Sequence, residues 1–274
     1  MTRCAAHDDP VNDDVYEVHA LRHALHEGTA SQTYHRFEVY GEPDRPLTTA
    51  FWFWVVRNER RTVLLDCGYS AGRARERGRT VLASPAELLG RLGLSPADVD
   101  HVVLSHLHWD HVGNVELFPH ATFSIAREEF AFWRGPFGHR PCLGLALGDE
   151  ELASVEALER EGRLFQVEGE RHRLYPGIDL AVMPGHTPGQ LVAEVATSSG
   201  TLVLASDAAH FYESLTLDRP FHAFTDLPGT YRTLQRLRSL AARPGTTVIP
   251  GHDPSDAATY PEVAENCFAL TASR

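Results

Sequence analysis

The stretch Ser105-His106-Leu107-His108-Trp109-Asp110-His111 decides how the rest of the chain is interpreted. It follows the apolar run Val102-Val103-Leu104, which is typical of a buried strand. His106 and His108 are two residues apart, so in an extended segment their side chains point the same way. Imidazoles this close would repel one another if protonated, whereas neutral rings can gather around a divalent cation. The stretch therefore predicts a metal site at the end of a strand.

The second half of the motif adds two more potential ligands. Asp110 and His111 come where the chain has to turn, and Gly113-Asn114 permits that turn. A surface cluster of polar residues at a strand end is the alternative interpretation. It leaves unexplained why three imidazoles and a carboxylate occupy six consecutive positions.

The pattern His-x-His-x-Asp-His at 106–111 resembles the signature of the metallo-β-lactamase superfamily of hydrolases. The longer stretch from Ser105 to Pro119 is most similar to the N-acyl-homoserine lactonase branch. The resemblance implies an α/β fold, a four-layer αββα sandwich of two mixed sheets with helices outside. The short motif says little about substrate, so the remaining ligands have to be found elsewhere in the chain.

Composition narrows the class of protein. The chain has 274 residues, with 43% hydrophobic and 23% charged side chains, as in ordinary globular proteins. The net charge of -12 argues against nucleic acid or an anionic membrane surface as a partner, because both would be repelled. No lysine is present, which excludes Schiff-base chemistry through lysine. We expect a small-molecule substrate.

Cysteine placement and the N-terminus bear on compartment and domain organisation. The four cysteines are widely scattered without a Cys-x-x-Cys pair, which favours a reducing compartment. The N-terminus is polar and acidic, unlike a signal peptide, and no apolar run is long enough to span a membrane. We predict a cytoplasmic protein with a flexible tail over residues 1–14 and a single hydrolase domain over residues 15–274.

Two β-forming runs upstream of the motif predict a hairpin. Residues 51–56 and 62–66 flank a polar tetrad and are rich in aromatic and branched side chains. Asp66 ends the second run in Asp66-Cys67-Gly68. The resemblance implies that this carboxylate orients a ligand histidine from behind. A simple turn is the alternative interpretation.

Other segments are less decisive. Ser84-Pro85-Ala86-Glu87 is a helix start with a capping box. The stretch 135–148 is rich in Gly and Pro without a helical or strand period, and forms either a pocket wall or lid or a plain surface loop. Residues 15–25 begin with an alternating apolar pattern that could open the first sheet. This region carries His19, His23 and His26, whose spacing would suit one helical face. They are a candidate for a second metal site, and exposed histidines without a metal are the alternative interpretation.

Three further residues with metal-binding side chains directly follow apolar runs that we expect to be strands. His186 lies in Pro184-Gly185-His186-Thr187-Pro188-Gly189, Asp207 follows Leu204-Ala205-Ser206, and His252 follows Ile249-Pro250-Gly251. Each residue alone is explained as a turn residue. Together with the first motif they match the order and context of the lactonase pattern.

Carried over position by position, the resemblance implies two divalent metal ions. His106, His108 and His186 would hold one ion. Asp110, His111 and His252 would hold the other, and Asp207 would bridge the two. Imidazole and carboxylate ligands without thiolate favour zinc, and iron, cobalt and manganese are also compatible with this set.

The predicted reaction is attack of a metal-bridging hydroxide on a carbonyl carbon. Asp110 would steer the water or carry a proton to the leaving group. Where the lactonases have a tyrosine that contacts the substrate carbonyl, this chain has His210. His210 is the candidate replacement and Tyr212 the alternative. Trp109, between two ligands, is a further candidate for substrate contact.

The function predicted from these features is ring opening of a lactone, with an N-acyl-homoserine lactone (a quorum signal) as the best candidate. Another ester, thioester or amide hydrolase of the same fold is the alternative. A non-catalytic metal-binding or ligand-binding protein is disfavoured, because no ligand of the set is missing. A homodimer is left open.

Overall fold

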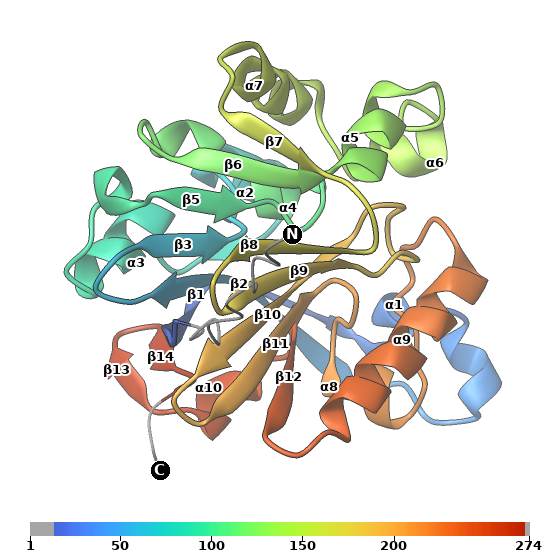
Figure 1. The fold of residues 1–274 in the computed structure, drawn as a ribbon. Coiled ribbons are helices and arrows are strands. Elements are labelled where there is room, and N and C mark those ends of the chain that lie inside the picture. The colour runs from blue at the N-terminus through green and yellow to red at the C-terminus, as the bar shows by residue number, and fades with distance from the viewer. Residues whose placement is uncertain (1–13, 272–274) are drawn as a thin grey trace, which may run out of the picture.

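The computed structural model describes residues 14–271. Two mixed β-sheets pack face to face, and helices cover the outer face of each sheet (Figure 1). The predicted four-layer αββα sandwich is therefore confirmed. The predicted tail over residues 1–14 lies outside the described residues except for Asp14, which forms ion pairs with Arg60 and Arg61.

The first sheet has the strand order β13-β14-β1-β2-β3-β5-β6-β7 within the described residues, with β4 paired to β1. Its strands are β1 (Glu17–Thr29), β2 (Pro46–Arg57), β3 (Thr62–Leu65), β4 (Thr80–Val81), β5 (His101–Val103), β6 (Thr122–Ala126), β7 (Leu164–Val167), β13 (Glu262–Ala264) and β14 (Cys267–Ala269). The predicted hairpin is formed by β2 and β3, with Trp54 opposite Leu65. Strands β3, β5 and β6 run parallel, so the segments that follow them meet at one edge.

The second sheet has the order β12-β11-β10-β9-β8. Its strands are β8 (Arg171–Tyr175), β9 (Ile178–Val182), β10 (Leu191–Thr197), β11 (Gly200–Ser206) and β12 (Thr246–Pro250). Strands β11 and β12 are parallel neighbours, which brings the segments after Ser206 and Pro250 together. These segments carry Asp207 and His252.

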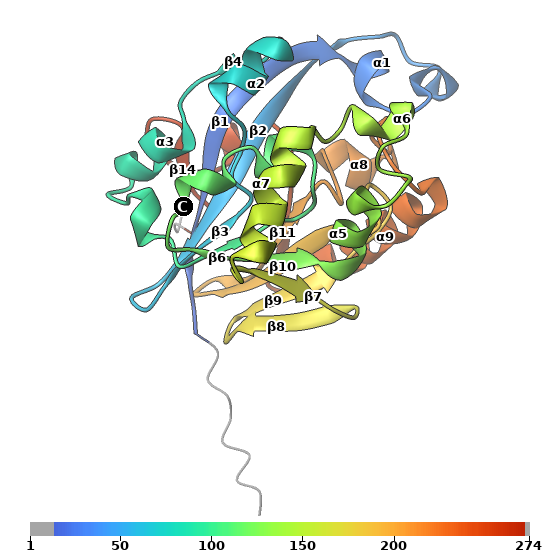
Figure 2. The same cartoon turned by 90° about the horizontal axis from the view of Figure 1, so that it is seen from above.

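Helices fill the outer layers and the connections. They are α1 (Ala30–Thr33), α2 (Ala71–Glu76), α3 (Pro85–Arg91), α4 (Trp109–Val112), α5 (Arg127–Arg134), α6 (Pro141–Gly144), α7 (Asp149–Arg160), α8 (Tyr212–Thr216), α9 (Leu227–Ala241) and α10 (Asp256–Thr259), with 3₁₀ turns η1 (Phe37–Tyr40), η2 (Pro96–Asp98) and η3 (Val115–Leu117). The capping box predicted for α3 is present, with Ser84 and Glu87 bonded to each other's backbone. Figure 2 shows β1 and β2 extending to the end of the molecule where α1, α2 and β4 lie.

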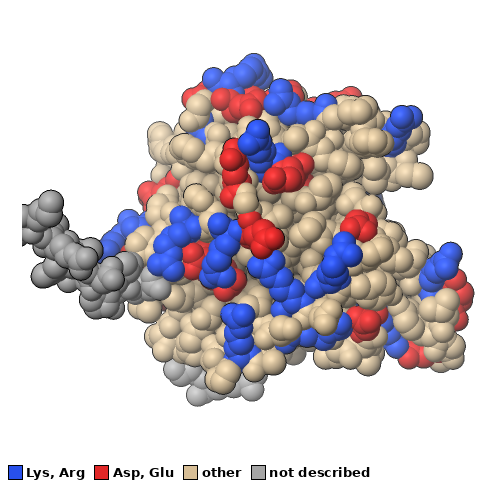
Figure 3. Space-filling view, turned by 45° about the vertical axis from the view of Figure 1, so that its right-hand side comes forward, with Lys and Arg blue, Asp and Glu red and all other residues tan. Residues whose placement is uncertain are grey.

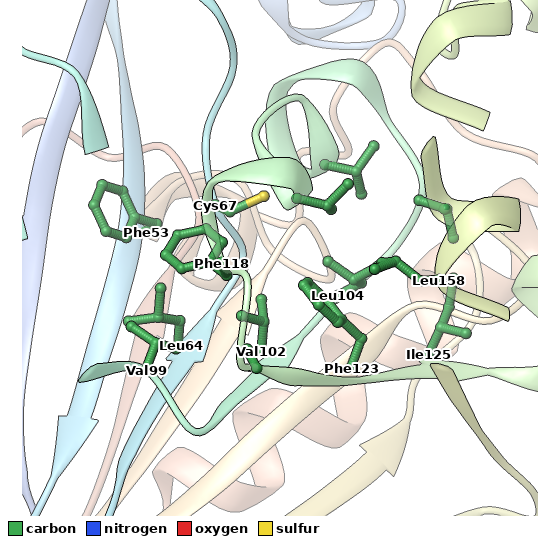
Figure 4. Packing of buried hydrophobic residues seen from close by; sticks show 14 of the residues in the cluster. Phe53, Leu64, Cys67, Val99, Val102, Leu104, Phe118, Phe123, Ile125 and Leu158 are labelled. Atoms are coloured by element: carbon green, nitrogen blue, oxygen red, sulfur yellow. The ribbon is translucent and has the colours of Figure 1, made fainter. Parts of the chain in front are cut away.

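Successive side chains of β2 point to opposite faces of the first sheet, which explains how the layers pack. Trp52 and Trp54 face the second sheet, while Phe53 and Val55 face the layer of α3, α5 and α7. Figure 4 shows the latter cluster, in which Phe53 lies near Phe118 and Leu64, and Val102 of β5 and Phe123 of β6 continue the same apolar layer. On the opposite side of the molecule α9 buries its leucines against the second sheet. The two sheets are thus fixed with their loop-bearing edges adjacent.

The strand expected over residues 15–25 is confirmed as β1, which carries His19, His23 and His26. The candidate second metal site is not formed among the described residues, because both ring nitrogens of His23 contact backbone carbonyls and none of the three histidines belongs to a group of potential ligands. The stretch 135–148 contains one helical turn, α6. On the face in Figure 3, arginines are interspersed with acidic side chains. Within residues 14–271 no helix is both long and apolar enough to cross a membrane.

Candidate metal centre

Asp207 lies between two groups of predicted ligands. Its Oδ2 is 3.3 Å from His186 Nε2 and 3.8 Å from His106 Nε2. Its Oδ1 is 3.0 Å from His252 Nε2 and 3.3 Å from His111 Nε2. Each carboxylate oxygen therefore faces a different group, as a bridging ligand would.

The first group consists of His106, His108 and His186. His186 Nε2 is 2.9 Å from His108 Nδ1 and 3.3 Å from His106 Nε2. Together with Asp207, all three offer ligand atoms within 4.8 Å of one another, and all four residues are buried. Buried nitrogens this close with carboxylate oxygen beside them fit a divalent cation, because neutral imidazoles and a carboxylate are its ordinary ligands.

The outer ring nitrogens determine which atoms face inward. His186 Nδ1 lies 2.9 Å from the carbonyl of Ala223, and His252 Nδ1 lies 2.8 Å from the carbonyl of Ala50. Because a carbonyl only accepts, each Nδ1 must carry the proton, and Nε2 is left with its lone pair toward the centre. The backbone thus presets the tautomer that a metal requires.

The second group consists of Asp110, His111 and His252. Asp110 Oδ2 is 3.6 Å from His111 Nε2 and 3.9 Å from His252 Nε2. Asp110 is the more accessible of the three, with 12% of its side chain exposed. A second cation fits here, and Asp110 is the ligand nearest to solvent.

Burial and charge shift the titration of these residues. Burial holds the pKa values of His106 and His108 well below their usual range and lowers that of His186 to about 3. Burial opposes protonation of His111 too, but three surrounding carboxylates, Asp207 foremost, raise its pKa to about 10. The first group is therefore neutral, and the second lies in a strongly negative field that attracts a cation.

Asp66, predicted to support a ligand, is fully buried and holds several parts of the site together. Its Oδ2 accepts from His111 Nδ1 at 2.8 Å and from Ser206 Oγ at 3.0 Å. Its two oxygens also accept from the amide and hydroxyl of Ser105. Asp66 has a left-handed backbone with φ 64°, which turns the carboxylate under the site.

Glu129 on α5 was not predicted from the sequence. It is fully buried, and its Oε1 accepts from Leu107 N at 3.0 Å and from Trp133 Nε1 at 2.7 Å. Its Oε2 accepts from Gly189 N at 3.0 Å. One carboxylate thus ties the loop of His106 and His108 to the loop of His186. The available signal was the spacing to Trp133, four residues on, which places both on one helix face.

Gly251 is required by a close approach beside the site. A Cβ at this position would lie 2.7 Å from the backbone of Ser206 and 2.9 Å from Asp207 Oδ1. Its amide donates to the carbonyl of Ala209 at 2.9 Å, and His252 N donates to His210 O at 2.8 Å. These contacts set the distance between His252 and Asp207.

His210 lies against the carboxylate of Asp207. Its Nε2 is 3.0 Å from Asp207 Oδ2, a contact without the alignment of a hydrogen bond. Its ring stacks on Phe221 with centroids 3.8 Å apart. Burial lowers its pKa to about 4. Tyr212, the alternative, donates its hydroxyl to Asp256 Oδ1 at 2.8 Å and is not part of the ligand groups.

Trp109 is placed beside the site but is largely covered. It is 7% exposed and contacts Tyr69 and Phe51, with ring centroids 4.7 and 6.3 Å away. Its amide donates to Ala146 O at 2.9 Å, which ties the 135–148 stretch to the motif. The guanidinium of Arg77 lies over its ring.

Known proteins show related sequences and folds. The N-acyl homoserine lactonase AttM of Azorhizobium caulinodans is 32% identical over 175 residues, which cover 60% of this chain and 61% of AttM. The chain thus matches less than two thirds of that relative.

Among solved structures, a quorum-quenching N-acyl homoserine lactone lactonase superposes with a TM-score of 0.76 at 21% identity, covering 92% of this chain and 98% of the other. AidC, a dizinc quorum-quenching lactonase, superposes with a TM-score of 0.73 at 19% identity, covering 96% of each chain.

The resemblance inferred from the motif is also found by comparison with protein families. Residues 52–252 match the family model of the metallo-beta-lactamase superfamily. This range begins in β2, includes the Asp66 turn and ends at His252, so it contains every predicted ligand. The chain belongs to the metallo-beta-lactamase superfamily.

Proposed function

We propose that this chain is a dinuclear metal-dependent hydrolase that opens a lactone ring, with an N-acyl-homoserine lactone as its best candidate substrate. The observation that carries the proposal is Asp207, whose two oxygens face two separate groups of buried ligands. The named lactonase relatives support the choice of a lactone.

The residues would divide between two ions. His106, His108 and His186 would hold one, and Asp110, His111 and His252 the other, with Asp207 shared. The set has imidazole and carboxylate but no thiolate, which favours zinc and is compatible with iron, cobalt or manganese. The dizinc centre named for AidC supports zinc.

When bound, the two ions supply an acidified water and polarise a carbonyl oxygen. Asp110, at the exposed side of the centre, would orient the nucleophile and deliver a proton to the departing alcohol oxygen. The buried layer of Asp66 and Glu129 keeps the ligand loops in place and excludes water from behind.

His210 would contact the substrate carbonyl in place of the tyrosine of the lactonases. Its Nε2 is buried and makes no aligned hydrogen bond to the Asp207 oxygen 3.0 Å away, so a proton on this nitrogen is available to an oxygen that becomes negative during the reaction. Stacking on Phe221 fixes the ring plane. Trp109 and Tyr212 are weaker candidates for substrate contact, because both are largely buried and Tyr212 is already bonded to Asp256.

We also infer one hydrolase domain over residues 15–274 with a tail over 1–14, and a cytoplasmic location. The free Cys67, Cys142 and Cys267 support the latter. The 135–148 stretch would flank the metal centre, since Ala146 O accepts a hydrogen bond from Trp109 N. A homodimer remains a prediction.

The test is acid release by the zinc-loaded protein on γ-lactones with and without an N-acyl amide, with Asp207→Ala as the inactive control. We expect rapid turnover of N-acyl-homoserine lactones. His210→Phe keeps the stack on Phe221 but removes the donor, and should lower kcat by about 100-fold with an unchanged metal content. His210→Tyr should retain much more activity. Turnover confined to simple esters or thioesters would instead establish the alternative hydrolase.

A further inference from the structure

Phe51 connects the candidate metal centre to a group of polar side chains that the reaction does not use. Its ring centroid is 5.2 Å from that of His252 on one side. On its other sides lie Tyr69, at 5.3 Å, and Trp109, at 6.3 Å. A single phenyl ring therefore separates a predicted metal ligand from Tyr69.

Two arginines lie on this aromatic platform. Arg77 and Arg79 belong to the turn between α2 and β4 (Figure 2). The Cζ of Arg77 is 4.8 Å from the ring centroid of Trp109, and that of Arg79 is 6.0 Å from the centroid of Phe51. Arg79 Nη1 donates to Arg77 O at 3.1 Å, which holds the two in one arrangement. Both side chains are half-buried.

Two donors of this group have no acceptor. Tyr69 Oη and Arg79 Nε are buried and make no hydrogen bond to any described residue. Burial raises the pKa of Tyr69, so its hydroxyl keeps its proton. A buried donor without an acceptor is energetically unfavourable, and such groups call for an explanation. A ligand that brings an acceptor would remove this cost.

The positive charge at this aromatic platform comes from Arg77 and Arg79, because the neighbouring Arg73 is already paired. Arg73 on α2 donates hydrogen bonds to Glu151 and Glu76, at 2.7 Å each. Arg77 gives one nitrogen, Nη2, to the carbonyl of Leu145. The charges of Asp110, which belongs to the second ligand group, and of Glu151 also act on Arg77, and that of Asp110 acts on Tyr69. The platform thus presents donors and positive charge beside a reaction centre, in a chain whose net charge is -12.

We propose that Tyr69, Arg77 and Arg79 form a subsite for a carboxylate on the substrate, so that the preferred lactone carries an acidic group on its acyl arm. Guanidinium and phenol donors match the planar acceptor pair of a carboxylate. The rings of Trp109 and Phe51, over which the guanidinium groups of Arg77 and Arg79 lie, would hold these donors beside the metal centre. This inference rests on the proposed lactone hydrolysis and narrows its substrate class.

The experiment compares two homoserine lactones of nearly equal shape. N-succinyl-homoserine lactone ends in a carboxylate, and N-succinamoyl-homoserine lactone ends in a neutral amide. With the zinc-loaded wild type, kcat/KM for the succinyl compound should be about ten-fold higher, the effect of one charge-assisted hydrogen bond. Arg77→Gln, Arg79→Gln and Tyr69→Phe should each reduce this preference to about two-fold or less.

Arg75→Gln is the matched control, because Arg75 is exposed on α2, directly before the turn that carries Arg77 and Arg79, and its loss changes the net charge equally. It should keep the full preference. Equal kcat/KM for both compounds in the wild type, or equal losses in Arg75→Gln and Arg77→Gln, would overturn the subsite.

A binding measurement separates this proposal from the function on which it rests. Calorimetry with the ring-opened products, N-succinyl-homoserine and N-succinamoyl-homoserine, does not need turnover. Tighter binding of the succinyl product to wild type, but not to Arg77→Gln, supports the subsite even if neither lactone is hydrolysed. Failure of hydrolysis alone would refute the lactonase, and equal binding of the two products would refute the subsite.

Discussion

Replacing Glu129 by glutamine tests whether a buried carboxylate behind the ligand loops controls the site. In the wild type Oε1 accepts from Leu107 and Trp133, and Oε2 accepts from Gly189. The amide of Glu129→Gln keeps one acceptor oxygen and turns its NH₂ toward an N–H donor. A hydrogen bond to a charged acceptor contributes about 1.5–3 kcal/mol, so the free energy of unfolding of Glu129→Gln should be about 2–3 kcal/mol lower than that of the wild type.

The loss should appear in both stability and metal affinity. For a chain of this size 2–3 kcal/mol corresponds to a fall in Tm of roughly 5 °C. Because Glu129 joins the loops of the first ligand group, zinc affinity should fall by about ten-fold or more. Differential scanning calorimetry and a zinc-chelator competition measure the two effects. Glu128→Gln, exposed on the same helix, is the control. Equal behaviour of the two variants would refute the role of Glu129.

Three further predictions follow from other residues. Asp66→Asn should lower zinc affinity by about 10- to 100-fold in a chelator competition, since His111 loses a charged acceptor; an unchanged affinity would contradict this. Removing the metals with a chelator should lower Tm, and restoring about 1,000 times the dissociation constant of zinc should return about 4 kcal/mol of stability; an unchanged Tm would argue against a metal centre. Burial lowers the pKa of His101 to about 4 in the folded state, below the unfolded value of about 6.5. The part of the unfolding free energy that depends on neutral His101, roughly 3 kcal/mol, is therefore fully present above pH 6.5 and is lost as the pH falls to about 4. Urea unfolding of His101→Asn should consequently show a weaker pH dependence over that range.

The predicted ligands could be found from the sequence because chemistry and strand position coincide there. His186, Asp207 and His252 each follow an apolar run, and the structure brings all three together with the first motif. Parallel pairing of neighbouring strands is what converts this pattern into proximity. The hairpin of β2 and β3 and the helix at α3 were equally clear, since their local signals agree with the fold.

Other features depend on contacts that no local pattern encodes. Strands β7 and β8 are partly polar and exposed, so they lack the alternation that marks a half-buried strand. Glu129 stands in a charged segment that is typical of a helix surface, and only tertiary packing buries it. The spacing of His19, His23 and His26 would suit a helical face, but the alternating apolar pattern of residues 15–25 was the correct signal, because this segment pairs with β2 as a strand.

The central claim is that one chain holds two cooperating metal ions around Asp207. The most direct measurement adds zinc stepwise to the metal-free protein and follows both bound zinc and ring opening of an N-acyl-homoserine lactone. We expect activity to rise to a plateau at two zinc ions per chain, and Asp207→Ala neither to bind both ions tightly nor to reach that activity. A plateau at one ion, or two ions bound without hydrolysis of any lactone, would contradict it.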